Sequence, residues 1–141
     1  MVEDAVPLGE IARALVVMLR HHGDVLLASP VPTVLRMQAP RAEIDALVYD
    51  DTAPMLAGHP DLAELHLVGR GWRGLPIPQR VASEWQLLQA LRARRYDLLI
   101  HLTEQPRCAW LARLLAPRYS VAPSIAGRGR FWAGSFSHRF P

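Results

Sequence analysis

The sequence predicts an α/β fold in which a parallel sheet carries helices on both faces, and three observations support this prediction. Short apolar runs of strand length alternate with segments of helical periodicity along most of the chain. Each strand is separated from the next by enough residues for a right-handed crossover, which favours parallel strands. The 141 residues, 50% of them hydrophobic and 21% charged, are typical of one domain with a buried core.

The N-terminal part contains a strand and a helix joined by a glycine turn. Residues 1–10 have no periodicity and are predicted as a loose lead-in, so that the domain spans 11–141. The apolar run 12–19 predicts the first strand. The apolar spacing that follows predicts a helix over 24–38, with Asp24 as its N-cap.

The middle of the chain repeats this alternation. Residues 43–49 are rich in apolar, β-branched and aromatic side chains and predict the second strand. Cap and first-turn residues then predict a short helix over 50–58 that ends at a glycine. A third strand is expected over 64–68. The glycines and prolines of 69–78 predict a loop in which Trp72 is exposed or covers an edge.

The longest helix is predicted over 79–95, and a cluster of arginines lies at its end. Its apolar residues recur at helical spacing, namely Val81, Trp85, Leu88 and Leu91. Arg92, Arg94 and Arg95 suit the negative end of a helix dipole. We therefore favour a structural role for these arginines over a phosphate site.

The remaining elements are two strands and one helix. Residues 97–102 read as a fully apolar fourth strand, 103–115 as a helix and 118–122 as a fifth strand. The inner face of that helix is expected to combine Cys108, Leu111, Ala112 and Leu115. Nothing after Pro123 is periodic, so no further element is predicted there.

The composition narrows the location and the partners. All 16 basic residues are arginines and the net charge is +3, which suits contacts with phosphates or carboxylates, although biased codon usage explains the arginines equally well. The single Cys108 fits a reducing compartment. The acidic N-terminus is unlike a signal peptide and no apolar run is long enough to span a bilayer. We expect a cytoplasmic protein with peripheral membrane contact at most.

The candidate site follows from the topology of such a sheet. In a doubly wound sheet the first and fourth strands are neighbours, and ligands bind at their carboxyl ends. This arrangement brings two polar loops together, 20–24 and 103–107. The candidate binding residues on these loops are Arg20, His21, His22, Gly23, Thr103, Glu104, Gln105 and Arg107.

Asp24 is the candidate catalytic residue. A carboxylate at a turn from strand to helix can act as a general base, while Gly23 lets a substrate approach the backbone. The alternative is that Asp24 only caps the helix, and both roles can coexist. Neighbouring histidines on a turn point apart, so we expect no metal site at His21 and His22.

Other ligand classes have weaker support. The turn lacks GxGxxG, and GxxxxGK[ST] is absent, which leaves a flavodoxin-like or other nucleotide-binding domain as a minor alternative. The spacing of the four tryptophans does not suggest nucleic-acid binding.

Four segments in order resemble the lipopolysaccharide core heptosyltransferases of glycosyltransferase family 9, in particular their heptosyltransferase III branch. They are ALVVMLRHHGDVLL over 14–27, LVYDDTAPML over 47–56, RRYDLLI over 94–100 with LTEQ over 102–105, and FW over 131–132 with SFSH over 135–138. The resemblance covers the chain from about residue 14 to its end. Met18, Glu104 and Pro106 depart from the family pattern, which bears on the acceptor more than on the fold.

The resemblance implies an enzyme of the GT-B class, with two Rossmann-like domains, of which this chain is the N-terminal, acceptor-side one. The reaction implied is transfer of heptose from ADP-heptose to the lipid-linked lipopolysaccharide inner core, with inversion and without metal or cofactor. Asp24 would be the base, and the missing C-terminal domain would bind most of the nucleotide. We expect Arg20 and Arg107 to hold acceptor phosphates or carboxylates. The location implied is the inner face of the inner membrane.

A second interpretation belongs to a different class of protein. The chain would then be a non-catalytic module, or a truncated remnant, that binds an anionic saccharide but lacks the donor site.

Overall fold

The computed structural model describes residues 6–103, 105–123, 132 and 134–140. Its centre is a six-stranded parallel sheet with the order β3-β2-β1-β4-β5-β6. The strands are β1 (Arg13–Val17), β2 (Glu43–Tyr49), β3 (Glu64–Val68), β4 (Leu98–His101), β5 (Tyr119–Pro123) and β6 (His138–Phe140). The predicted α/β class and the pairing of the first and fourth strands are confirmed.

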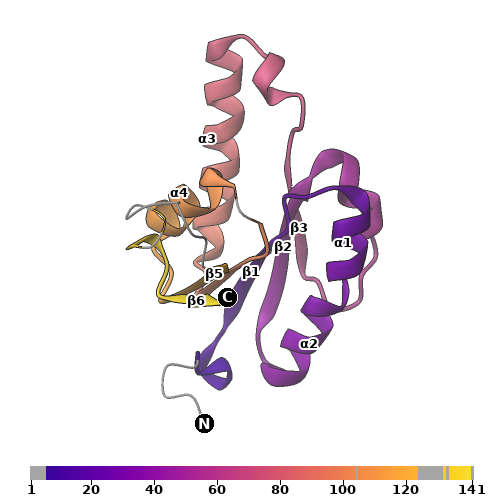
Figure 1. Cartoon of the computed structure of the whole chain (residues 1–141), viewed down its shortest axis with the longest axis vertical. Helices are drawn as coiled ribbons and strands as arrows, with labels where there is room; N and C mark the ends of the chain where they lie inside the picture. The colour runs from indigo at the N-terminus through magenta and orange to yellow at the C-terminus, as the bar shows by residue number, and fades with distance from the viewer. Residues whose placement is uncertain (1–5, 104, 124–131, 133, 141) are drawn as a thin grey trace.

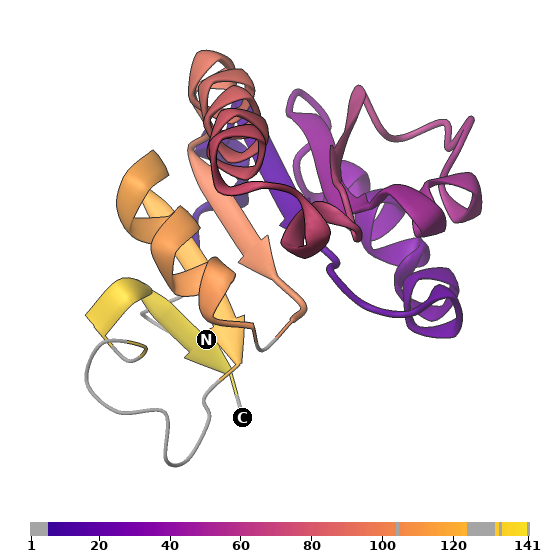
Figure 2. The same cartoon turned by 90° about the horizontal axis from the view of Figure 1, so that it is seen from above.

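Helices cover both faces of the sheet (Figures 1 and 2). The helices α1 (His22–Ala28) and α2 (Pro30–Gln38) lie on one face, and α3 (Ile77–Arg94) and α4 (Pro106–Leu115) lie on the other. Within the described residues, three short 3-10 helices lie in the connections, η1 (Leu8–Glu10), η2 (Asp50–Met55) and η3 (Trp72–Gly74). No helix among the described residues is both long and apolar enough to cross a membrane.

The sheet separates two apolar cores because successive strand residues point to opposite faces. Leu15 and Val17 of β1 pack with α3 and α4, whereas Ala14 and Val16 pack with α1 and α2. The inner face predicted for the helix after the fourth strand is confirmed, since Cys108, Leu111 and Ala112 are buried and Leu115 packs against them.

Several predicted features of the first half of the chain differ from the structure. The helix expected over 24–38 is two helices that meet at Ser29, because Pro30 lacks an N–H and begins a new helix at its first position. The loop expected over 69–78 contains η3 and ends earlier, since α3 begins at Ile77. Trp72 is half-buried against the core, so it is not an exposed loop residue.

The longest helix extends past the carboxyl edge of the sheet (Figure 1). An 18-residue helix is roughly 27 Å long, whereas a five-residue strand spans roughly 17 Å. Leu87 and Leu91 are buried against the sheet, but Val81 and Trp85 are each 60% exposed. The predicted helix is confirmed, but only the C-terminal half of α3 packs its apolar residues against the sheet.

Two predictions about the C-terminal third are corrected. The fourth strand is not fully apolar, because it ends in His101, whose side chain is completely buried. The chain after Pro123 adds a sixth strand that was not predicted. Trp132 and Phe136 are buried in the same core as α4, and Ser137 exchanges hydrogen bonds with Ser120 of β5.

Candidate active site at the carboxyl end of β1

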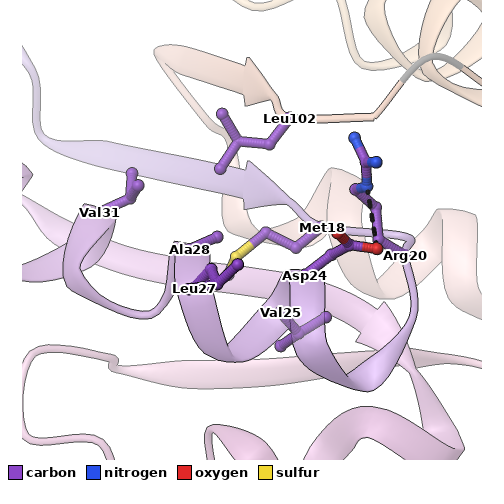
Figure 3. A pocket seen from close by; sticks show the side chains of 8 residues that line it. All are labelled: Met18, Arg20, Asp24, Val25, Leu27, Ala28, Val31 and Leu102. Carbon is purple, nitrogen blue, oxygen red and sulfur yellow. Dashed lines mark ion pairs between the residues drawn. The ribbon is translucent and has the colours of Figure 1, made fainter.

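The turn after β1 opens into a pocket of about 370 Å³ on the α1 face of the sheet (Figure 3). Asp24 and Arg20 supply its charged groups. The remaining lining is apolar and comes from Met18, Val25, Leu27, Ala28, Val31 and Leu102. Leu102 follows β4, so the pocket lies where the first and fourth strands end side by side, as the topology predicts.

Asp24 lies in the first turn of α1 but does not cap the helix. The N-cap is His21, and no side-chain hydrogen bond caps this end. The expectation that Asp24 is the N-cap is therefore wrong, because the helix begins two residues earlier, at His22. Asp24 Oδ2 instead lies 3.6 Å from Nε of Arg20, four residues earlier in the chain, and the side chains of Asp24 and Arg20 are 40% and 47% exposed. The Asp24 carboxylate therefore remains accessible from the pocket.

The loop after β4 meets this turn as predicted, and it does so through hydrogen bonds between its side chains and the backbone of Leu19. Leu19 N donates to Thr103 Oγ1 at 2.9 Å, and Gln105 Nε2 donates to Leu19 O at 3.1 Å. Gln105 also exchanges hydrogen bonds with the Tyr49 hydroxyl at the end of β2. Thr103 and Gln105 thus hold the turn in place, and Glu104 lies outside the described residues.

His21, His22 and Gly23 are exposed, and the last two lie in the first turn of α1. The His22 ring Nε2 lies 2.7 Å from the carbonyl oxygen of Asp51, which ties the start of α1 to η2. No side chain or backbone atom lies within 4 Å of a Cβ placed on Gly23, so the fold itself does not require a glycine there. The surroundings of Gly23 therefore leave open space beside the start of α1.

Arg107 does not face the Asp24 pocket. Its guanidinium binds both carboxylate oxygens of Glu84 on α3, at 2.5 and 2.6 Å. This bidentate pair raises the pKa of Arg107. Arg107 therefore links α4 to α3, and its predicted place beside Arg20 and Asp24 is wrong.

Arg70, which follows β3, was not predicted as part of the site. Its guanidinium stacks on the Tyr49 ring at 3.9 Å, donates from Nε to Asp51 at 2.7 Å and reaches the carbonyl oxygen of Arg20 at 3.4 Å. The hydrogen bond from Arg70 to Asp51 lowers the pKa of Asp51. The sequence held one signal, namely that Arg70 follows a parallel strand and so lies at the same edge as Arg20.

The described residues contain one cluster with the ligand types of a metal site, Asp45, Glu64 and His66, and it lies elsewhere. Asp45 is completely buried and receives hydrogen bonds from Arg94 at 2.8 Å and from the Tyr96 hydroxyl at 2.6 Å. Burial opposes ionisation of Asp45, but the bonds from His66, Arg94 and Tyr96 outweigh it and lower its pKa to about 2. Arg94 thus fills the place that a cation would take. The structural role predicted for the arginines at the end of this helix holds for Arg94.

Relatives were found by sequence and by structure, although no family model matches. The chain is 36% identical over 124 residues to lipopolysaccharide heptosyltransferase 3 of Escherichia coli, and equally to that of strain K12. The match covers 87% of this chain and 36% of the relative. The chain thus spans about a third of the length of the curated relatives it matches.

Solved structures share the fold at lower sequence identity. A glycosyl transferase family 9 protein from Veillonella parvula superposes with a TM-score of 0.76 at 21% identity, covering 92% of this chain and 36% of that one. E. coli heptosyltransferase WaaC, solved with ADP-2-deoxy-2-fluoro heptose, gives 0.75 at 23% identity and coverages of 91% and 42%. E. coli heptosyltransferase II gives 0.68 at 19%, with coverages of 92% and 35%.

The strand order and the position of the pocket are those of Rossmann-like α/β domains. Such domains bind ligands at the carboxyl edge of a parallel sheet. Within this class the structural likeness is to glycosyltransferase family 9. The sequence identity is more specific, since over 87% of its length the chain is similar to lipopolysaccharide heptosyltransferase 3. The family resemblance inferred from the four sequence segments is thereby confirmed.

Proposed function

We propose that this chain supplies the acceptor side and the catalytic base of an inverting heptosyltransferase of lipopolysaccharide core synthesis. The observation that carries the proposal is the Asp24 carboxylate, which is free of capping and accessible in a pocket at the carboxyl end of β1. Sequence identity to lipopolysaccharide heptosyltransferase 3 supports the reaction class. The donor would be ADP-heptose, because the relative WaaC was solved with an analogue of that compound.

The chemistry assigns one proton transfer to this chain. The acceptor hydroxyl attacks the anomeric carbon of heptose while the bond from that carbon to ADP breaks, so a single displacement inverts the configuration. Asp24 accepts the proton that the hydroxyl loses. Arg20, at 3.6 Å from Asp24, restrains the carboxylate and offers a guanidinium to an acceptor phosphate. This mechanism invokes no resident metal or cofactor.

The proposal places most of the nucleotide contacts outside this chain, in a second, C-terminal domain of the GT-B class. The relatives are long enough for such a domain, since the match covers only 36% of their length. The acceptor would be the anionic, lipid-linked inner core, met at the cytoplasmic face of the inner membrane.

A chimera tests this proposal. The matching segment of E. coli lipopolysaccharide heptosyltransferase 3 is replaced by this chain, and heptose transfer from ADP-heptose to isolated core acceptor is followed by mass spectrometry. We expect Asp24→Asn to lower the transfer rate by about 10²–10⁴-fold, as loss of a general base does. Asp61→Asn, an acidic residue that bonds Thr33 outside the pocket, serves as the matched control.

Acceptor binding by the 141-residue chain separates catalysis from simple saccharide binding. We expect Asp24→Asn to keep acceptor affinity within a fewfold while Arg20→Gln weakens it. Heptose transfer at an unchanged rate by the Asp24→Asn chimera would refute the role of Asp24 as the catalytic base. Acceptor binding together with no transfer by the unsubstituted chimera would favour the non-catalytic module instead.

A further inference from the structure

A second pocket, of about 1030 Å³, lies between α3 and α4 on the opposite face of the sheet from Asp24. We call it the α3–α4 groove. Val68, Leu87 and Leu111 are the buried members of its lining. Tyr49, which ends β2, and Arg70, which follows β3, also line the groove.

The walls of the groove are unusually apolar for a surface. On α3, Ile77, Val81 and Trp85 follow each other at intervals of four residues and are 75%, 60% and 60% exposed. On α4, Trp110 and Leu114 are 56% and 49% exposed. Exposed apolar residues that gather in one place mark a binding surface. We therefore expect the groove to be a binding surface for another molecule.

The charge around the groove is positive. Four arginines line it, Arg70, Arg73, Arg80 and Arg107, against one acidic residue, Glu84. Glu84 already binds Arg107, and Arg70 is paired with Asp51. Arg73 and Arg80 have no carboxylate partner among the described residues. An occupant must therefore offer apolar surface and negative charge together.

We propose that the α3–α4 groove docks this chain onto an anionic phospholipid surface. Trp85 and Trp110 would lie at the level of the headgroups, where indole rings are favoured, and the aliphatic side chains would enter the acyl boundary. Arg73 and Arg80 would contact lipid phosphates. A second copy of the chain fits less well, because a two-fold contact through this groove would bring both sets of arginines together, and the one acidic residue in each groove, Glu84, already binds Arg107. This inference is independent of the heptosyltransferase reaction.

Vesicle binding tests the inference on the 141-residue chain. Sedimentation with vesicles of phosphatidylcholine alone is compared with vesicles that contain 30% phosphatidylglycerol. We expect binding to the anionic vesicles, and a decrease of that binding as salt rises. Arg73→Gln and Arg80→Gln should each weaken the partition coefficient about fivefold, since a basic residue near an anionic surface contributes on that order. Val81→Ser with Trp85→Ser should weaken it at least as much.

Matched controls lie on α2 and just after it. Met37→Ser removes an apolar side chain that is 74% exposed, and Arg41→Gln removes an exposed guanidinium, and both should leave vesicle binding unchanged. Equal loss in these controls, or no binding of the unsubstituted chain, would overturn the proposal. A dimer seen by light scattering without lipid, and dispersed by the α3 substitutions, would overturn it in favour of a second copy. Neither assay contains donor or acceptor, so failure here leaves the test of Asp24 intact.

Discussion

Acidification should destabilise this fold through one residue, His101. Its side chain ends β4, is completely buried and packs edge-on against Phe136, with ring centroids 5.0 Å apart. Neither ring nitrogen has a hydrogen-bond partner within the part of the chain that the structure describes. Burial therefore lowers the pKa of His101 from 6.5 to about 3.

The sign and size of the effect follow from linkage. The unfolded chain binds a proton at His101 below about pH 6.5, whereas the folded chain excludes that proton until about pH 3. Stability is therefore lost progressively as the pH falls through this window. Between pH 7 and pH 5 the loss from this one group is about 2 kcal/mol. Asp45 does not contribute in that range, because its pKa is about 2 when folded against 3.8 in the unfolded chain.

Urea unfolding at pH 7 and pH 5 measures this difference. We expect His101→Leu to lose about 2 kcal/mol less than the unsubstituted chain between the two pH values, whatever its stability at pH 7. His101→Phe should behave alike, which separates the proton effect from packing. His21→Gln, at an exposed position, is the control and should keep the full dependence. Retention of the full loss by both His101 variants would refute the reasoning.

Two further predictions concern packing and a buried charge. Gly69→Ala should lower the unfolding free energy by about 1–3 kcal/mol, because the added Cβ would lie 1.9 Å from Trp72 Nε1. Displacement of the Trp72 ring should also change the near-ultraviolet circular dichroism, and an unchanged spectrum would contradict this prediction. Arg94→Met should cost about 3–5 kcal/mol in urea unfolding, because it leaves Asp45 buried without its cation. Arg94→Met combined with Asp45→Asn should recover part of that loss, and equal costs for the single and double variants would contradict the pairing.

The strands that were predicted best are those whose pattern is local. The bounds predicted for β2 and β3 agree with the structure, since each is a short apolar run between turn residues. β6 could not be read in the same way, because its three residues are too few to show a period. The break at Ser29 was also missed, since the apolar spacing continues across it and only Pro30 indicates a new helix.

The position of the candidate site could be predicted, because strand order alone determines which strand ends are neighbours. The neighbouring ends of the first and fourth strands were expected from strand order, and the bond from Leu19 N to Thr103 Oγ1 confirms that contact. The direction of a long side chain depends on distant partners. Arg107 turns to Glu84, which is 23 residues earlier in the chain, and spacing gives no sign of that pairing. The roles of Asp24 and the other candidate residues stay predictions.

The two proposed surfaces meet at the carboxyl edge of the sheet, and Arg70 is the residue that joins them. It lines the α3–α4 groove, and its guanidinium also reaches the carbonyl oxygen of Arg20 beside the Asp24 pocket. A chain whose groove rested on a lipid surface would hold this edge close to the headgroups. A saccharide linked to that lipid would then reach Asp24 over a short distance, and the soluble donor would approach from the water side. Docking and proton transfer would thus require the same orientation of the domain.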